Sequence, residues 1–551
     1  MKYLLTGVAA IAMLTACSKK DKPPGEEAPA GIVFSQEKIP DYKIQKGDPA
    51  TAAQALAAMS LDTSGAGLVS WDNKNLSGDK VVFTNVTLVS AGDDEEDEDG
   101  MSFDADDDSF DLDGADLKAK KLEFEGLAMK DGQATFSRML MSDIALVPTD
   151  PEEADQGSGK IGSIELVNPS PETAAWVASL FGTGPEQDMP EGAALSFDHW
   201  AINDINFSID ENEGDQGTFT LDTVEVTGLK DQKAALMRVG KLDFDMVDGE
   251  DGNRIKMKLG GIEMHGIDLK MLSEATDEAE NPGNMSDMMK LGAQDPANPG
   301  YESLLVDNLS MDIAGVKLDL PKLTSNVGRN KANTVVAVKT DPFKMTLSTG
   351  EGELGDELAG PLAMMGFQTV ELTGAGYQTY EPSTDLTTYV KGQNFWEVKD
   401  GFRMDLGMQF AGAKAIAAAE QDYGMSASPT AALDSALEKL VLHNFEINLK
   451  DDGLVDRAFN AYATTNGQDP KTARNQVAGM LAMAPMMAGG SGIDMDLVNE
   501  ASAALSSFIS DPKTLTIKLA PKEPVSMAAL ADLEDPSQVT KETLGFTASN
   551  K

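Results

Sequence analysis

A short pattern of alternating apolar residues recurs nine times and limits the fold more than any other feature. In its clearest copy, apolar residues alternate from Leu440 to Leu442, and after Asn444 they resume one position out of phase at Phe445 and Ile447. Alternation with a period of two is typical of a half-buried β-strand. The shift residue is Gly, Asn or Asp in each copy: Asn85, Gly126, Asp143, Asp204, Gly228, Gly266, Asn308, Gly374 and Asn444.

A one-residue slip would send every later side chain to the opposite face of the sheet. A β-bulge cancels this slip by inserting one unpaired residue, and Gly, Asn and Asp tolerate the positive φ that such positions adopt. The pattern therefore favours long strands bent at a bulge. The alternative is a short hairpin at each shift, for example at Glu125-Gly126.

These elements predict an α+β fold dominated by β-structure. We expect a long, curved antiparallel meander of bulged strands over residues 46–411, interrupted by an acidic loop at 92–114. Helical patterns with Pro at their boundaries follow in residues 412–551, and strand patterns return near the end. This C-terminal region is therefore expected to pack on the sheet and to be continuous with it.

The N-terminus has the features of an export signal. Lys2 provides the positive charge, and the apolar stretch from Leu4 to Leu14 is too short for a lasting membrane span. Leu14-Thr15-Ala16-Cys17 resembles a bacterial lipobox, which implies a signal peptide at 1–16, diacylglyceryl transfer to Cys17 and a flexible tether at 17–45. Several acyl chains on one cysteine suffice for stable membrane anchoring. The resemblance also implies an outer-membrane destination facing the periplasm, because Ser18 stands where inner-membrane lipoproteins carry aspartate.

The chain is strongly acidic, with 44 basic and 91 acidic residues and a net charge of −47. This charge argues against nucleic acid as a partner. Carboxylates are densest between Asp93 and Asp113, where Ca²⁺ is conceivable. The spacing does not match an EF-hand, so a solvated loop is favoured over a calcium site. The candidate calcium ligands are Asp104, Asp106, Asp108, Asp111 and Asp113.

Motifs typical of catalytic, metal-binding or phosphate-binding sites are scarce. The three histidines, His199, His265 and His443, lie far apart in the sequence, and none has a second histidine at metal-ligand spacing. No Gly-x-Ser-x-Gly elbow or phosphate-binding loop occurs. We therefore expect no catalytic site, no metal and no cofactor, although a hydrolase whose site the sequence does not reveal remains a third hypothesis.

A cluster of methionines surrounds Pro485. Methionine fills irregular or adaptable apolar surfaces. Two interpretations follow: ordinary packing of a helix on the sheet, or a pliable lid over an apolar groove. The cluster consists of Met480, Met483, Met486 and Met487.

Two resemblances extend this interpretation. The segments 508–517 and 452–457, with Pro521 and Pro524-Val525, resemble the C-terminus of uncharacterised exported proteins of alphaproteobacteria. The bent-strand repeats resemble AsmA-type envelope proteins, whose curved sheets form lipid-sized grooves, although Cys17 here replaces their N-terminal transmembrane helix. Together they imply a non-enzymatic, lipid-anchored envelope protein that binds lipid or another apolar ligand. The alternative is an interaction scaffold with a fully packed core and no ligand.

Overall fold

The computed structural model describes residues 31–34, 38–89, 115–148, 157–183, 188–210, 216–247, 253–270, 298–414, 439–488, 494–527 and 539–551. The chain divides into two compact units: unit 1 contains residues 1–36, 271–310 and 315–551, and unit 2 contains residues 37–270 and 311–314. The division falls near residue 270, whereas the sequence suggested a change of region at 411. Residues 412–551 thus share a unit with the strands that precede them.

Strand content confirms the β-dominated α+β class, with 51% strand and 22% helix. Each unit contains an antiparallel sheet, and helices follow the strands in the C-terminal part, as the sequence predicts. No helix in the described ranges is long and apolar enough to cross a membrane.

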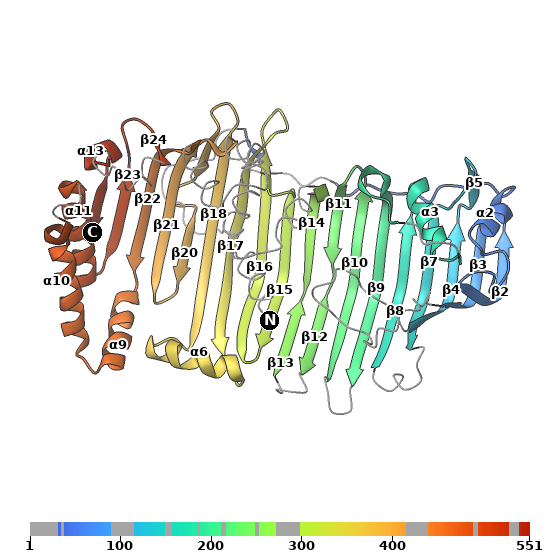
Figure 1. Cartoon of the computed structure of the whole chain (residues 1–551), viewed down its shortest axis with the longest axis horizontal. Helices are drawn as coiled ribbons and strands as arrows, with labels where there is room; N and C mark the ends of the chain where they lie inside the picture. Colours follow the sequence, from blue (N-terminus) through green and yellow to red (C-terminus); the bar gives the residue numbers. More distant parts are fainter. Residues whose placement is uncertain are drawn as a thin grey trace. The chain divides into compact units, whose positions relative to one another are not determined.

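Unit 2 is a meander in which neighbouring strands follow one another in the chain (Figure 1). Strand β10 pairs along one edge with both β11 and β12. Strand β11 then pairs with β14, and β12 pairs with β13. Its main sheet contains β2 (Val69–Ser77), β3 (Lys80–Leu88), β4 (Ala115–Glu125), β7 (Arg138–Pro148), β8 (Gly157–Val167), β9 (Phe197–Asp210), β10 (Gln216–Leu229), β11 (Lys233–Val239), β12 (Leu242–Val247), β13 (Arg254–Leu259) and β14 (Gly261–Asp268). Its other elements are α2 (Ala52–Ala58), the hairpin β5 (Ala128–Lys130) and β6 (Gln133–Thr135), α3 (Pro171–Ser179) and η1 (Gly192–Ala194).

Unit 1 also contains antiparallel strands, together with the C-terminal helices. Its strands are β1 (Val33–Phe34), β15 (Ser303–Ile313, whose last three residues group with unit 2), β16 (Val316–Arg329), β17 (Val335–Thr349), β18 (Thr369–Glu381), β19 (Leu386–Tyr389), β20 (Phe395–Val398), β21 (Phe402–Ala411), β22 (Val441–Asp451), β23 (Thr514–Leu519), β24 (Val525–Ser526) and β25 (Thr547–Asn550). Its helices are α6 (Glu353–Met364), α9 (Leu454–Asn466), α10 (Pro470–Ala488), α11 (Met495–Ser510) and α13 (Lys541–Leu544).

Eight of the nine shift residues lie inside a strand, as the bent-strand interpretation predicts. The second repeat differs. Strand β4 ends at Glu125, Gly126 adopts φ +70°, and the chain leaves the main sheet to form the separate hairpin β5–β6. The turn of that hairpin is Asp131-Gly132, with φ +53° and +86°, where the sequence signals a reversal.

The bends in unit 2 are not single-residue insertions, and this corrects the bulge prediction for that unit. Thr84 lies opposite Lys121 and Val86 lies opposite Ala119, so the register is the same on both sides of Asn85. The same holds around Asp143 and Asp204. Neighbouring strands each leave one residue out of the ladder at the same level, so the whole sheet bends without a slip. The residues at this level are Asp72, Asn85, Lys120, Asp143, Gly162, Asp204 and Asp222.

Backbone geometry separates the shift residues into two groups. Seven adopt φ between +48° and +70°, namely Asn85, Gly126, Asp143, Asp204, Gly228, Gly266 and Asn308. Gly374 and Asn444 do not have positive φ, but each lies beside a true register shift, at Thr340/Phe343 and at Gln409/Phe410. At Asn444 the extra residue lies in β22 itself, as the bulge prediction requires, whereas opposite Gly374 the extra residue lies in the partner strand β17. A further register shift in unit 1 falls at Gly328/Arg329, where the sequence repeats predict none.

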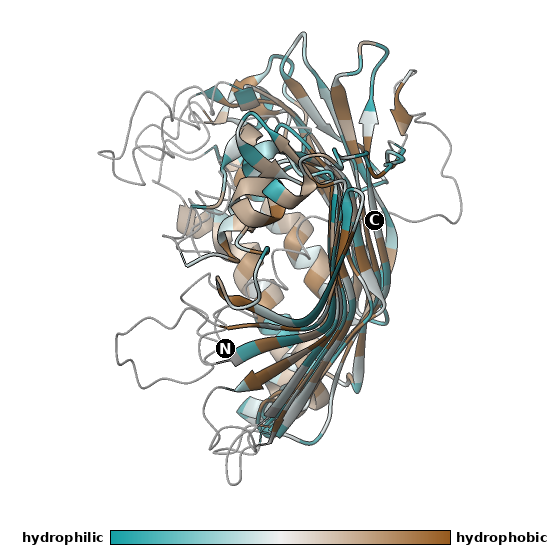
Figure 2. Cartoon of the chain, turned by 90° about the vertical axis from the view of Figure 1, so that its right-hand side faces the viewer, coloured by the Kyte–Doolittle hydropathy of each residue, from teal (hydrophilic) through white to brown (hydrophobic). Residues whose placement is uncertain are grey.

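The largest core lies in unit 2, on the face of the sheet that α2 and α3 cover, the inner side of its curve (Figure 2). Leu56 of α2 and Val177 of α3 pack there with Phe83 and Phe124. In unit 1, α9 and α11 cover β22 and β23 in the same manner. That core contains Val455, Phe508 and Leu515, with Leu449 packed against it.

Candidate functional site

Two of the predicted sites lie outside the described residues. Cys17 and the candidate calcium ligands Asp104, Asp106, Asp108, Asp111 and Asp113 belong to ranges that the structure does not describe. Within the ranges that it does describe, no group of three or more His, Cys, Asp or Glu side chains is placed to hold a metal ion.

The inner face of unit 2 carries aromatic and methionine side chains beyond the helical cover. Ile205 packs against the core under α2 and α3, and Phe207 points to the same face because side chains alternate along a strand. Phe207 lies opposite Phe219, with ring centroids 6.0 Å apart. The row continues across β12 and β13 through Phe244 and Met257. All four of these side chains are half-buried, so they form a continuous apolar strip.

An equivalent strip crosses unit 1. Leu449, under α9 and α11, lies opposite Met404, which lies opposite Trp396. Gly374 pairs with both Trp396 and Phe343, and a Cβ atom there would approach the Phe343 ring to 2.7 Å. The absent side chain lets the two rings meet edge to face at 5.9 Å. Gly374 is therefore required by aromatic packing on the inner face.

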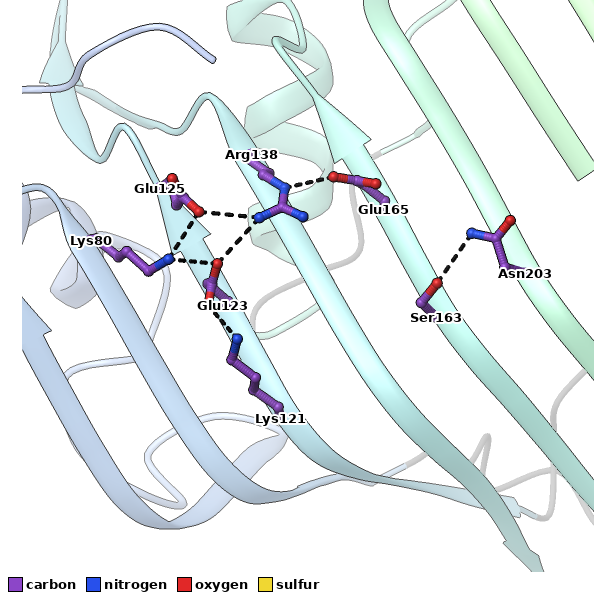
Figure 3. A network of polar contacts seen from close by, with 8 residues as sticks. All are labelled: Lys80, Lys121, Glu123, Glu125, Arg138, Ser163, Glu165 and Asn203. Carbon is purple, nitrogen blue, oxygen red and sulfur yellow. Dashed lines mark hydrogen bonds and ion pairs between the residues drawn. The ribbon is translucent and has the colours of Figure 1, made fainter. Parts of the chain in front are cut away.

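The opposite face of unit 2 carries a lattice of ion pairs (Figure 3). Glu123 is buried and accepts hydrogen bonds from Lys80 at 2.7 Å and Arg138 at 3.2 Å, with the ammonium of Lys121 at 2.5 Å. Arg138 also bonds Glu125 at 3.1 Å and Glu165 at 2.5 Å. Three cations thus neutralise three carboxylates across four strands.

This environment fixes the protonation state of Glu123. Burial raises the pKa of its carboxyl, but hydrogen bonds from Lys121 and Lys80 outweigh burial and lower the pKa from 4.5 to about 2. A general acid or base needs a pKa near the working pH. A carboxylate held ionised by three cations is suited to joining strands rather than to proton transfer.

Unit 1 repeats this arrangement on its own outer face. Glu371 pairs with Lys344 and Lys399, and Arg403 pairs with Glu397 and Asp405. Exposed pairs of this kind contribute only about 0–1 kcal/mol each. Their main consequence is that the outer faces are polar and internally neutralised, while the inner faces are apolar.

A segment near the N-terminus crosses the strand ends of unit 2, and we call residues 38–48 the strap. Tyr42 stacks on His199, whose Nδ1 lies 3.0 Å from Thr227 Oγ1. The side-chain amide of Asn168 donates to Lys43 O at 2.9 Å. Gly126 accommodates the strap, because a Cβ atom there would lie 2.7 Å from Gln45 O. The sequence predicts a flexible tether at 17–45 and carries no signal for the contact of the strap with unit 2.

The methionine cluster lies on the exposed side of α10. Met480, Met483, Met486 and Met487 are 57, 52, 83 and 84% exposed, so they do not pack on the sheet. The opposite side of α10 makes its packing contacts instead, through the buried Ala473 and Ala478. The methionines therefore do not pack α10 on the sheet, and their role as a lid stays a prediction.

Comparison with protein families matches the C-terminal part of the chain. The model of a family described as an uncharacterized protein matches residues 395–551, from β20 to the C-terminus. The matched stretch lies in unit 1 and contains α9, α10 and α11. No curated protein matches the sequence.

Proposed function

We propose that this protein is a non-enzymatic, lipid-anchored protein of the bacterial cell envelope that holds a lipid or another apolar ligand against the inner face of its sheet. The observation that carries the proposal is the half-buried strip of Phe207, Phe219, Phe244 and Met257 beyond the helices of unit 2. Contiguous apolar patches of more than a few hundred Å² are unusual on monomeric proteins unless they bind something.

The chemistry of the two faces supports an apolar ligand. Binding sites for small molecules are mostly apolar with few polar groups. The inner strips offer aromatic rings and thioethers, whereas the charged residues of both units lie on the outer faces in paired networks. An apolar ligand could therefore cover the side chains of the inner face without displacing hydrogen bonds that these side chains make. An acyl chain fits this surface better than a charged metabolite does.

The location is part of the same proposal. The lipobox-like segment ending at Cys17 supports export and acylation, and Ser18 supports the outer membrane as the destination. A protein tethered to a bilayer by acyl chains would meet lipids as its most abundant apolar ligands.

The test uses the full chain with Cys17→Ser, purified without detergent, and measures bound phospholipid by mass spectrometry. We expect lipid to co-purify and Met257→Gln to reduce it several-fold, because an amide replaces a thioether in the strip. Lys258→Gln is the matched control, since the neighbouring side chain points to the outer face, where it pairs with Asp243 at 2.5 Å.

A second variant addresses unit 1. Met404→Gln changes the strip of that unit, and Lys450→Gln is its control on the outer face. Loss of lipid in only one of the two inner variants would assign the ligand to that unit. Protein that carries no lipid and takes up no added fluorescent fatty acid would overturn the proposal and favour the interaction scaffold.

A further inference from the structure

The most exposed apolar surface in the described ranges lies on the C-terminal half of α10. Met480, Met483 and Met487 follow the i, i+3, i+7 spacing that places side chains on one helix face. Met486 lies beside them, and two of the four are more than 80% exposed. The helix itself is held in place, because Ser506 Oγ of α11 donates to Ala478 O at 2.8 Å. The methionine face is therefore presented to solvent by a packed helix.

This face is also uncharged within a chain of net charge −47. Residues 475–493 contain no Asp, Glu, Lys or Arg. The two basic residues of α10, Lys471 and Arg474, lie in its first turns, and Arg474 pairs with Asp456 of α9. All 91 acidic residues of the chain lie outside residues 475–493, so the exposed methionines can approach an apolar medium with little charge to desolvate.

We infer that the methionine face of α10 docks on the surface of a lipid bilayer of low net charge. Helices with one apolar face bind bilayers with that face at the boundary of headgroups and acyl chains. Acyl chains on Cys17 would hold the protein at a bilayer, where this face could then dock. The inference rests on the proposed anchoring at Cys17. It concerns a different surface from the ligand strip.

The chain's N-terminal segment enters the described structure in the same unit as the methionine face. Strand β1 pairs with β16, so the chain enters the described structure in unit 1, the unit that contains α10. The stretch from Cys17 to Gly31 can span at most roughly 50 Å at about 3.6 Å per residue. A second copy of the chain is a poorer occupant, because two chains of −47 repel each other at close range.

The experiment measures flotation of the Cys17→Ser chain with vesicles of phosphatidylethanolamine and phosphatidylcholine. We expect binding that decreases on vesicles rich in phosphatidylglycerol. Met483→Asp/Met487→Asp should lower the partition coefficient by about tenfold or more, because two carboxylates would enter the interface. Met483→Leu/Met487→Leu should retain binding. Asn499→Asp/Ala503→Asp is the control, since it places two carboxylates at the same spacing on exposed positions of α11.

Three outcomes would overturn the inference: the Cys17→Ser chain does not float, Met483→Asp/Met487→Asp floats equally well, or the Asn499→Asp/Ala503→Asp control loses as much binding. If the Cys17→Ser chain were a dimer that Met483→Asp/Met487→Asp converts to a monomer, the methionine face would serve self-association instead. Co-purified phospholipid, measured on the same variants, separates the two proposals. We expect it to be unchanged in Met483→Asp/Met487→Asp, and a failure of flotation with bound lipid intact would leave the proposed function standing.

Discussion

The ring of Tyr42 stacks on the imidazole of His199 with 5.0 Å between their centroids and 17° between their planes. This contact joins the strap to the outer face of β9. Burial, followed by the nearby carboxylates of Glu165 and Glu225, raises the pKa of the Tyr42 phenol. The phenol therefore stays protonated at neutral pH. Towards its C-terminal end the strap is also held by backbone hydrogen bonds, from Gln45 to Asn168 Oδ1 at 3.4 Å and from Gly47 to Asp79 Oδ2 at 2.7 Å.

We expect Tyr42→Ala to release the strap while leaving unit 2 folded. Tyr42 is 40% exposed, so the global free energy of unfolding should fall by less than about 1 kcal/mol. Limited proteolysis should cut the variant faster within residues 38–46. Replacing the more distant exposed Ile39 with Ala serves as the control. Equal cleavage of Tyr42→Ala and wild type would show that the stacking does not hold the strap.

The second prediction concerns the left-handed backbone at Gly266, where φ is +59°. A β-branched residue is strained at positive φ, so Gly266→Val should lower the free energy of unfolding by more than about 1 kcal/mol. Gly266→Asn should cost less, because Asn tolerates this conformation. Thr218→Val, at an exposed position of β10, should be nearly neutral. Urea melts of the three variants measure these differences, and a silent Gly266→Val would contradict the backbone assignment.

The third prediction concerns acid stability. The pKa of Glu123 is lowered to about 2, so its ionised form stabilises the folded state above pH 4.5, the pKa of an unperturbed glutamate. That stabilisation, on the order of 3 kcal/mol, is lost as the pH falls from about 4.5 to about 2. Glu123→Gln should therefore destabilise the protein at pH 7 and match wild type near pH 2.

Glu191→Gln is the control for this titration, because Glu191 is exposed and outside the lattice. Chemical denaturation at pH 7, 4 and 2 measures all three proteins. If the free energy of unfolding of Glu123→Gln fell between pH 4.5 and pH 2 as steeply as that of wild type, the titration of Glu123 would not cause the loss of stability in acid.

The sequence predicts the strands well because one periodicity governs them. Alternation places Val81, Phe83 and Val86 on the buried side of β3, and their positions can be found from hydropathy alone. The shift at Asn85 can also be recognised. What the pattern cannot show is that neighbouring strands bend at the same level, since that depends on pairing partners far away in the chain, such as Lys120 with Asp143.

The polar sites are harder to predict for the same reason. Lys80, Glu123 and Arg138 each alternate with apolar residues and resemble ordinary solvent-facing positions. Their interaction arises only when β3, β4 and β7 pair. The methionine cluster shows the opposite difficulty. Its apolar composition predicts burial, yet the packing face of α10 is made by small alanines, which leaves Met486 and Met487 exposed.

The last prediction concerns Cys17, on which the proposed location depends. Only a thiol at this position can accept the diacylglyceryl group, and Cys17 is the sole cysteine of the chain. Metabolic labelling with a palmitate analogue should therefore mark the wild type, and Cys17→Ser should abolish the label. Cell fractionation should at the same time move the protein from the membrane fraction to the soluble periplasmic fraction. Ser18→Asp, which keeps the thiol, should retain the label and shift the protein towards the inner membrane. Equal labelling of wild type and Cys17→Ser would rule out acylation at this cysteine and remove the basis for anchoring.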